Sequence, residues 1–167
     1  WSTVDWERIV ILGEDNVKRV WTVAPSGFKR LIATKSFTNG ADAVAVAELY
    51  EKVSTAVLAG LQRTDMESLP LRLSDAASYA EALAMCQSLK RLFMRSCLRE
   101  GGTPDETAVA LFASLPAGSL PELREWDLMS NRLGEHGAEA IALALQRGAM
   151  PKLEKINSIG NSFNEET

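Results

Sequence analysis

The chain has 167 residues, of which 46% are apolar and 24% are charged, and its formal net charge is −4. That size and composition fit a globular protein with one hydrophobic core, and the absence of any uncharged apolar run of about 18 residues excludes a membrane-spanning helix. Residues 1–99 carry 13 basic and 11 acidic side chains and residues 100–167 carry 5 and 11, so no continuous basic stripe is available for nucleic acid.

The first part of the chain alternates short apolar runs with turn-forming residues. Three seven-residue runs, rich in β-branched and aromatic side chains, span 6–12, 17–23 and 28–34, and four turn residues separate each run from the next. This spacing is typical of antiparallel strands, because parallel strands need a longer crossover connection. We therefore predict that residues 1–38 form an antiparallel β-meander that serves as a cap or accessory sheet.

The second predicted domain covers residues 39–167 and begins with a helix. Between Gly40 and Leu61, apolar side chains recur at steps of three and four, which is the period of one helical face. They are Val46, Leu49, Tyr50, Val53, Val57 and Leu61. This leading helix is expected to pack one apolar stripe against the rest of the domain.

Three further helices are predicted from their capping signals. Asp75 is placed to cap a helix over Ala76–Cys86. The segment Thr103–Glu106 has the pattern of a capping box, with a proline at the first helical position. A third helix begins near Gly137, and Gly148 is expected to end it.

A nine-residue motif, apolar-x-x-apolar-x-apolar-x-x-Asn/Cys, recurs in front of or behind these helices. It covers Leu89–Cys97, Leu123–Asn131 and Leu153–Asn161, and a degenerate copy at Met66–Ser74 contains Pro70. In a strand, the apolar positions of the motif point to one side, and stacked strand–helix units can bury them in a shared core. The alternative is a set of ordinary amphipathic segments with chance asparagines.

The motif copies resemble leucine-rich repeats of the ribonuclease-inhibitor type over residues 66–167. The resemblance implies an α/β solenoid with parallel strands on its concave side, helices on its convex side and an incomplete last repeat. The side chain that ends each motif can bond backbone groups where the strand turns away, so a structural ladder is predicted from Cys97, Asn131 and Asn161. Leu92, Trp126 and Ile156 are expected side by side on adjacent parallel strands.

The sequence offers little chemistry for catalysis or metal binding. His136 is the chain's one histidine, and its neighbours in sequence, Glu135 and Glu139, do not make a positioned base partner. Cys86 and Cys97 are eleven residues apart without further soft ligands, which argues against a zinc site. We predict a protein that is not an enzyme and has no cofactor. Two cysteines do not make a disulfide framework, which favours an intracellular location, in the cytoplasm or in an organelle interior.

Candidate binding residues lie at the outward positions of the predicted strands. Phe93, Met129 and Ile159 would expose apolar side chains on the concave face, and polar specificity is expected from Arg95, Asp127 and Asn157. The alternative is that another part of the protein covers the apolar side chains. Arg91, Glu125 and Lys155 alternate in sign and predict a cross-strand charge ladder worth about 0.2–1 kcal/mol per pair.

A basic cluster contains Lys90, Arg91, Arg95 and Arg99. We interpret it as a solvated rim, with an acidic partner or a phosphate as the alternative.

These features favour a non-catalytic module that binds another protein through its concave face or its open solenoid end. The alternative is an accessory subunit of a large assembly, with the N-terminal sheet docked on a neighbour through Trp1, Trp6 and Trp21. Because the chain starts at Trp1 without a methionine, we expect a processed or partial product.

Overall fold

The computed structural model describes residues 10–12, 18–20, 24–35, 39–99 and 103–163. Within these residues the fold has a four-stranded parallel sheet, a two-stranded antiparallel sheet and five helices. The parallel strands, in spatial order, are β3 (Arg63–Asp65), β4 (Arg91–Phe93), β5 (Glu125–Asp127) and β6 (Lys155–Asn157). The helices are α1 (Pro25–Ala33), α2 (Gly40–Gly60), α3 (Leu73–Ala84), α4 (Pro104–Ala113) and α5 (Glu135–Gln146).

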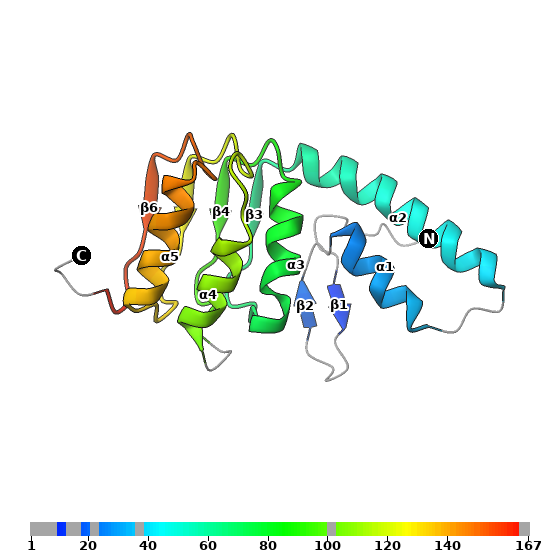
Figure 1. Ribbon diagram of the computed structural model, residues 1–167, viewed down its shortest axis with the longest axis horizontal. Helices are drawn as coiled ribbons and strands as arrows, with labels where there is room; N and C mark the ends of the chain where they lie inside the picture. Colours follow the sequence, from blue (N-terminus) through cyan, green and yellow to red (C-terminus); the bar gives the residue numbers. More distant parts are fainter. Residues whose placement is uncertain (1–9, 13–17, 21–23, 36–38, 100–102, 164–167) are drawn as a thin grey trace.

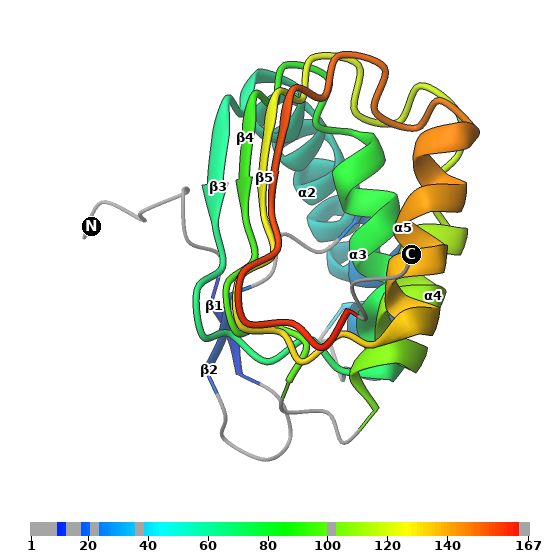
Figure 2. The ribbon, with the colours of Figure 1, turned by 90° about the vertical axis from the view of Figure 1, so that its left-hand side faces the viewer.

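The parallel sheet and the helices form two layers. Figure 1 shows α3, α4 and α5 beside one another in the same order as the strands that they connect. Figure 2 views the layers edge-on, with the strands on one side and the helices on the other. Helix α2 leads into β3 and packs against α1. All described helices therefore leave the second face of the sheet uncovered, and we name this face the open face.

The core lies between the two layers, at the inward positions of the strands. Leu92, Trp126 and Ile156 are in register on β4, β5 and β6, so the predicted side-by-side placement of these three residues is confirmed. The Trp126 ring meets Phe112 of α4 edge-on, with 5.0 Å between ring centroids. Leu89 and Leu123, at the first position of the motif, are fully buried. The edge-to-face contact of Trp126 with Phe112 adds to the stabilisation that comes from burying apolar area.

A shared turn follows each parallel strand. The third residue after each strand has a positive φ, and these residues are Ser68, Ser96, Ser130 and Gly160. The turn redirects the chain from the sheet towards the helix layer. A left-handed conformation is uncommon for serine, so its recurrence at one place in four units indicates a geometry that the packing imposes.

The predicted fold class is wrong. Four strands of three residues are too few to show a leucine-rich-repeat solenoid, and no antiparallel meander covers the N-terminal region in the part of the chain that the structure describes. The fold is instead a small α/β arrangement in which a four-stranded, all-parallel sheet carries helices on one face.

The third strand of the predicted meander, residues 28–34, is a helix. Helix α1 begins at Pro25, a residue that suits the first turn of a helix, and Phe28 stacks on Tyr50 of α2 with 3.7 Å between ring centroids. The run was short enough to fit either a strand or a helix, and packing against α2 decides between them. Of the other two runs, the structure describes β1 (Val10–Leu12) and β2 (Lys18–Val20), which pair antiparallel; residues 6–9, 17 and 21–23 lie outside the described residues.

The first parallel strand lies earlier in the chain than the degenerate motif predicts. The strand is β3, at Arg63–Asp65, and it pairs in register with Arg91–Phe93. Thr64 takes the position that Leu92 holds in the next strand, and this polar residue hid the motif from a search for apolar spacing. Pro70 therefore lies in the loop between β3 and α3 instead of in a strand.

The helical predictions hold for the elements but fail for some caps and for part of the predicted apolar stripe of α2, where Val46 is 40% and Leu49 63% exposed. Helix α3 begins at Leu73, so Asp75 lies in its first turn and is not its cap. At α4, Thr103 is the N-cap and Pro104 begins the helix, but the cap side chain makes no hydrogen bond, so the capping box is not formed. Gly148 has a φ of 73° just after α5, as expected for a helix-ending glycine.

None of the described helices is long and apolar enough to cross a membrane.

The two cysteines are buried in the core. Cys86 and Cys97 are both unpaired, and burial raises the pKa of each thiol to about 12.

The raised thiol pKa values predict a loss of stability at alkaline pH. The unfolded thiols ionise near pH 9 while the folded ones stay protonated to about pH 12, so stability is fully present below pH 9 and falls as the pH rises between these values. Each thiol contributes a slope of up to about 1.4 kcal/mol per pH unit. Urea unfolding at pH 8 and pH 10 should show a smaller loss for a Cys86→Ala, Cys97→Ser double variant. An equal loss in both proteins would contradict the prediction.

Candidate functional site

The open face presents a grid of side chains from four adjacent strands. Alternate residues of each strand point away from the helices, because successive side chains of a strand point to opposite faces. One row runs through Arg63, Arg91, Glu125 and Lys155, and the next runs through Asp65, Phe93, Asp127 and Asn157. Just beyond the strands, Glu67, Arg95, Met129 and Ile159 follow at two-residue steps along the chain. All six residues predicted to bind a partner belong to this grid.

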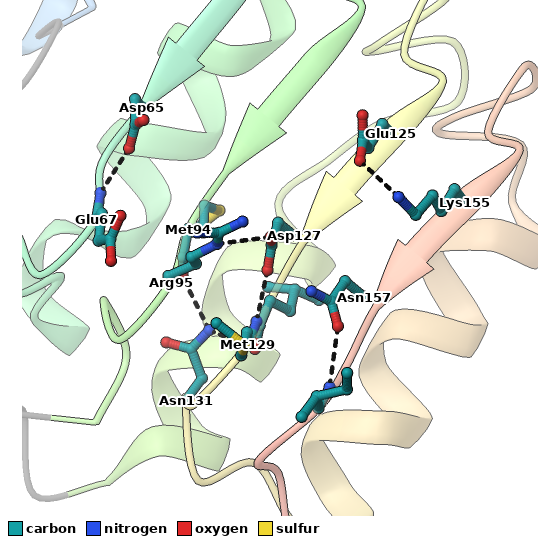
Figure 3. Close-up of polar contacts among 12 residues, drawn as sticks. Asp65, Glu67, Met94, Arg95, Glu125, Asp127, Met129, Asn131, Lys155 and Asn157 are labelled. Carbon is teal, nitrogen blue, oxygen red and sulfur yellow. Dashed lines mark hydrogen bonds and ion pairs between the residues drawn. The ribbon is translucent and has the colours of Figure 1, made fainter.

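Arg95 and Asp127 form the most buried charged contact of the open face (Figure 3). The Arg95 Nε donates to Asp127 Oδ2 at 2.7 Å, and Asp127 is only 3% exposed. Burial alone would raise the pKa of Asp127, but hydrogen bonds from the Met129 amide, Arg95 and Asn157 hold this pKa below its usual value. The predicted polar pair is thus a bonded unit within the sheet, with the guanidinium as its more exposed part.

An acceptor side chain at the end of three strands bonds the amide two residues further along. Asp65 Oδ1 accepts from the Glu67 amide at 3.1 Å, and Asp127 Oδ1 accepts from the Met129 amide at 3.0 Å. The amide of Ile159 donates to Asn157 Oδ1 at 3.3 Å in the same way. Sequence reasoning missed this role, although the spacing of Asp or Asn before the turn is visible in the sequence and typical of a turn-forming side chain.

The three apolar candidates of the open face do not share one row. Phe93 is level with Asp127 and Asn157, whereas Met129 and Ile159 lie beyond the strand ends. Ile159 is 70% exposed, and Phe93 and Met129 are half-buried. The Arg63 guanidinium lies over the Phe93 ring, with its Cζ 4.5 Å from the ring centroid, and the Arg95 Cζ is at 5.7 Å. Phe93 is therefore a cation-flanked aromatic surface.

The predicted charge ladder forms in part. Lys155 Nζ donates to Glu125 Oε1 at 2.9 Å, which joins β5 and β6 (Figure 3). Arg91 is in register with Glu125, but the structure records no ion pair of Arg91 with any residue it describes. Sequence reasoning also missed Arg63, which is in register with Arg91, because the degenerate motif predicts the first strand five residues too late, with Leu69 in the place that Thr64 takes.

The side chains at the end of the motif bond backbone groups between neighbouring units. Asn131 is fully buried; its Oδ1 accepts from the Leu98 amide at 2.8 Å, and its Nδ2 donates to the carbonyls of Met94 at 2.7 Å and Leu128 at 2.8 Å. Asn161 Oδ1 accepts from the amides of Asn131 and Leu133.

Cys97 takes the corresponding place one unit earlier. Its Sγ donates to the Met66 carbonyl at 2.7 Å. Each of these side chains thus reaches back to the unit before it, and together they tie the described units to one another.

Strand β6 ends the sheet among the described residues and is less buried than the strands before it. Leu92 and Trp126 are essentially inaccessible, yet Ile156 at the same position is 36% exposed. Leu153 is half-buried, where Leu89 and Leu123 are buried completely. This edge combines unpaired strand backbone with partly exposed core side chains, a combination that favours association with another strand or surface.

Among the described residues, few side chains are arranged for metal binding or acid–base chemistry. No group of three or more His, Cys, Asp or Glu residues in the described ranges is placed to hold a metal ion. His136 is exposed near the start of α5. Of the predicted basic cluster, Lys90 Nζ lies 3.4 Å from Gln62 Oε1 and Arg95 bonds Asp127, so its members have separate roles.

Comparisons with known proteins leave the family of this chain open. No protein-family model matches the chain, and no curated protein is significantly similar to it. Among solved structures, actin-binding site 2 of leiomodin-1 is similar with a TM-score of 0.49 and 14% identity, over 70% of this chain and 78% of that one. A likeness at this level carries no argument about function. The resemblance to ribonuclease-inhibitor-type repeats stays a prediction of the sequence.

Proposed function

We propose that this protein is a non-catalytic module that binds another protein through the open face of its parallel sheet or through the β6 edge. The proposal depends above all on one observation: Ile159, which continues the outward positions of β6 at a two-residue step, is 70% exposed. A large exposed apolar side chain is ordinary when single, but here Phe93 and Met129 add half-buried apolar area on the open face, and Ile156 adds partly exposed area at the β6 edge.

The chemistry around these side chains supports protein recognition. Charged groups of both signs surround the apolar side chains, as at the polar rim of many interfaces. Arginine and aromatic residues, here Arg63, Phe93 and Arg95, are the types that contribute most to binding at protein interfaces. Short strands with bonded turns hold these groups in fixed positions, which lowers the entropy cost of binding.

Site-specific photo-crosslinking tests the proposal. The full chain would carry p-benzoylphenylalanine in place of Met129 or Ile159 and would be irradiated in native extract. Ala142, an exposed residue of α5 on the helix layer, provides the matched control position. We expect a discrete protein adduct from the two open-face positions that is absent from the control. No adduct at either position, or the same adduct at Ala142, would contradict the proposal.

A second proposal is an accessory role in a larger assembly, and α2 favours it. Val44 and Leu49 are exposed on the N-terminal half of this helix, away from the open face. A neighbouring subunit would cover them in an assembly. The tryptophans that first suggested this role, Trp1, Trp6 and Trp21, lie outside the described residues. Size-exclusion chromatography separates the two proposals: a stable monomer favours the binding module, whereas aggregation that Val44→Lys and Leu49→Lys relieve favours the assembly subunit.

A further inference from the structure

The first two strands of the parallel sheet place two like charges opposite each other. Arg63 of β3 and Arg91 of β4 are register partners, and both side chains are exposed at the open face. Like charges directly opposite each other on neighbouring strands repel, whereas opposite charges there attract. The free protein therefore holds an unfavourable pair at this place.

The ion pairs that join neighbouring units at the strands and just before them are all of opposite sign. They are Arg95–Asp127, Lys155–Glu125, Lys152–Glu122 and Arg124–Glu154, each of which joins one unit to the next. Glu125 is the register partner of Arg91 on the other side, but its carboxylate bonds Lys155 Nζ at 2.9 Å. Arg91 is thus left without a carboxylate among the described residues, in a sheet that otherwise pairs its charges.

Arg63 is positioned but only weakly neutralised. Its Cζ lies 4.5 Å from the centroid of the Phe93 ring, and this contact restricts where the guanidinium sits on the open face. Its contact with Asp65 is long, at 3.5 Å, and both of these side chains are about half exposed. Arg95, the other cation near Phe93, is committed to Asp127 at 2.7 Å.

We propose that Arg63 and Arg91 together bind a carboxylate side chain of a partner protein, and that an apolar partner side chain packs on Phe93. This inference rests on the proposed function and names the chemistry of its partner. A carboxylate accepts two parallel N–H bonds from a guanidinium, and one placed between two guanidinium groups also removes their repulsion. Arg91 and Phe93 are two residues apart on one strand, so an extended partner segment with the pattern acid-x-apolar has matching spacing.

The surrounding charges select a single carboxylate over a polyanion. Asp65 lies two residues from Arg63 on β3, Glu125 is the register partner of Arg91, and residues 100–167 carry six more acidic than basic side chains. A nucleic-acid backbone or a polyphosphate would place its further charges against these carboxylates. The face is therefore matched to one acidic side chain beside apolar surface.

A peptide titration of the full chain tests this inference. The probe is the blocked pentapeptide Ac-Thr-Glu-Thr-Leu-Thr-amide, and its matched control replaces Glu by Gln. We expect shifts of the arginine Nε–Hε signals of Arg63 and Arg91 in ¹⁵N-edited NMR spectra with the Glu peptide, and at least about tenfold weaker binding with the Gln peptide. An Arg63→Gln, Arg91→Gln double variant should lose binding, whereas Lys35→Gln, Lys52→Gln, with the same charge change at exposed sites elsewhere, should keep it.

Stability of the free protein gives a second readout that a merely structural role would not produce. Arg63→Glu turns the like-charge pair into an opposite-charge pair without placing a second acid opposite Glu125, so the thermal midpoint should rise by up to about 4 °C. A fall in the midpoint would overturn the claim that Arg91 is unpaired. Equal binding of the Glu and Gln peptides would overturn the proposed ligand. Binding of oligo(dT) that is lost in the Arg63→Gln, Arg91→Gln variant would overturn it as well. If photo-crosslinks form at Ile159 while the Glu peptide fails to bind, this inference fails alone; if neither is seen, the proposed function fails with it.

Discussion

Replacing Asn131 by alanine is expected to lower the free energy of unfolding by about 2–5 kcal/mol. The Asn131 side chain is fully buried and bonds the Leu98 amide and the Met94 carbonyl, both in the preceding unit. Alanine leaves these two backbone groups unbonded in the core, at about 1–3 kcal/mol each, and also leaves a small cavity. The Leu128 carbonyl is less affected, because it keeps its bond from Asn161 Nδ2. Urea unfolding followed by tryptophan fluorescence measures the loss.

Two matched variants sharpen this test. Gln146→Ala removes an exposed amide at the end of α5 and should change stability by less than about 0.5 kcal/mol. Asn131→Cys copies the preceding unit, where Cys97 donates to the Met66 carbonyl, so it should restore the bond to Met94 but not the one from Leu98. Its stability should lie between wild type and alanine. A loss for Asn131→Ala no larger than that for Gln146→Ala would contradict the bonding that the structure shows.

The parallel strands β4, β5 and β6 could be predicted from sequence because their spacing reports packing directly. Leu92, Trp126 and Ile156 stand at one position of a repeated motif, and a residue at that position must face the helix layer for the unit to bury its core. The role of Asn131 could be predicted for a related reason: an asparagine that recurs at a fixed place after an apolar strand is well suited to bond the backbone of the turn that follows. These signals are local in sequence and shared between copies.

The elements that sequence reasoning misplaced depend on contacts between distant residues. Residues 28–34 have no strong period of their own, and their helix is settled by packing such as that of Phe28 on Tyr50. β3 was misplaced because Thr64 replaces an apolar residue, and its position follows only from pairing with β4. The solenoid was an extrapolation from motif to architecture, which four short strands do not establish.

The candidate surface was predictable residue by residue but not as a network. Alternation along the strands identified the outward positions, including Phe93 and Ile159. The burial of Asp127, its bond with Arg95 and the pairing of Arg63 with Arg91 depend on which side chains meet across strands. Sequence spacing along one strand carries no information on that choice when several charges are in reach.

The second large effect is expected from truncating the apolar position of the strands, and it should depend on the place of the strand in the sheet. Leu92→Ala on β4 should cost about 2–5 kcal/mol, because Leu92 is fully buried between neighbouring units and helices. Ile156→Ala on β6 removes a similar side chain from the same position of the motif. Since Ile156 is 36% exposed, the cost should be about 1 kcal/mol.

The comparison of these two variants measures how open the β6 edge is in solution. Both would be unfolded in urea at two protein concentrations tenfold apart, with size-exclusion chromatography of the same samples. Unequal costs that do not depend on concentration mean that the edge is free to accept a partner, as the proposed function requires. Equal costs mean that the β6 edge is covered in solution. If the cost of Ile156→Ala also depends on protein concentration, a second copy of the chain covers the edge, because self-association stabilises the folded state by mass action. Equal costs without that dependence would assign the cover to the same chain, and the β6 edge would then be removed from the candidate surface.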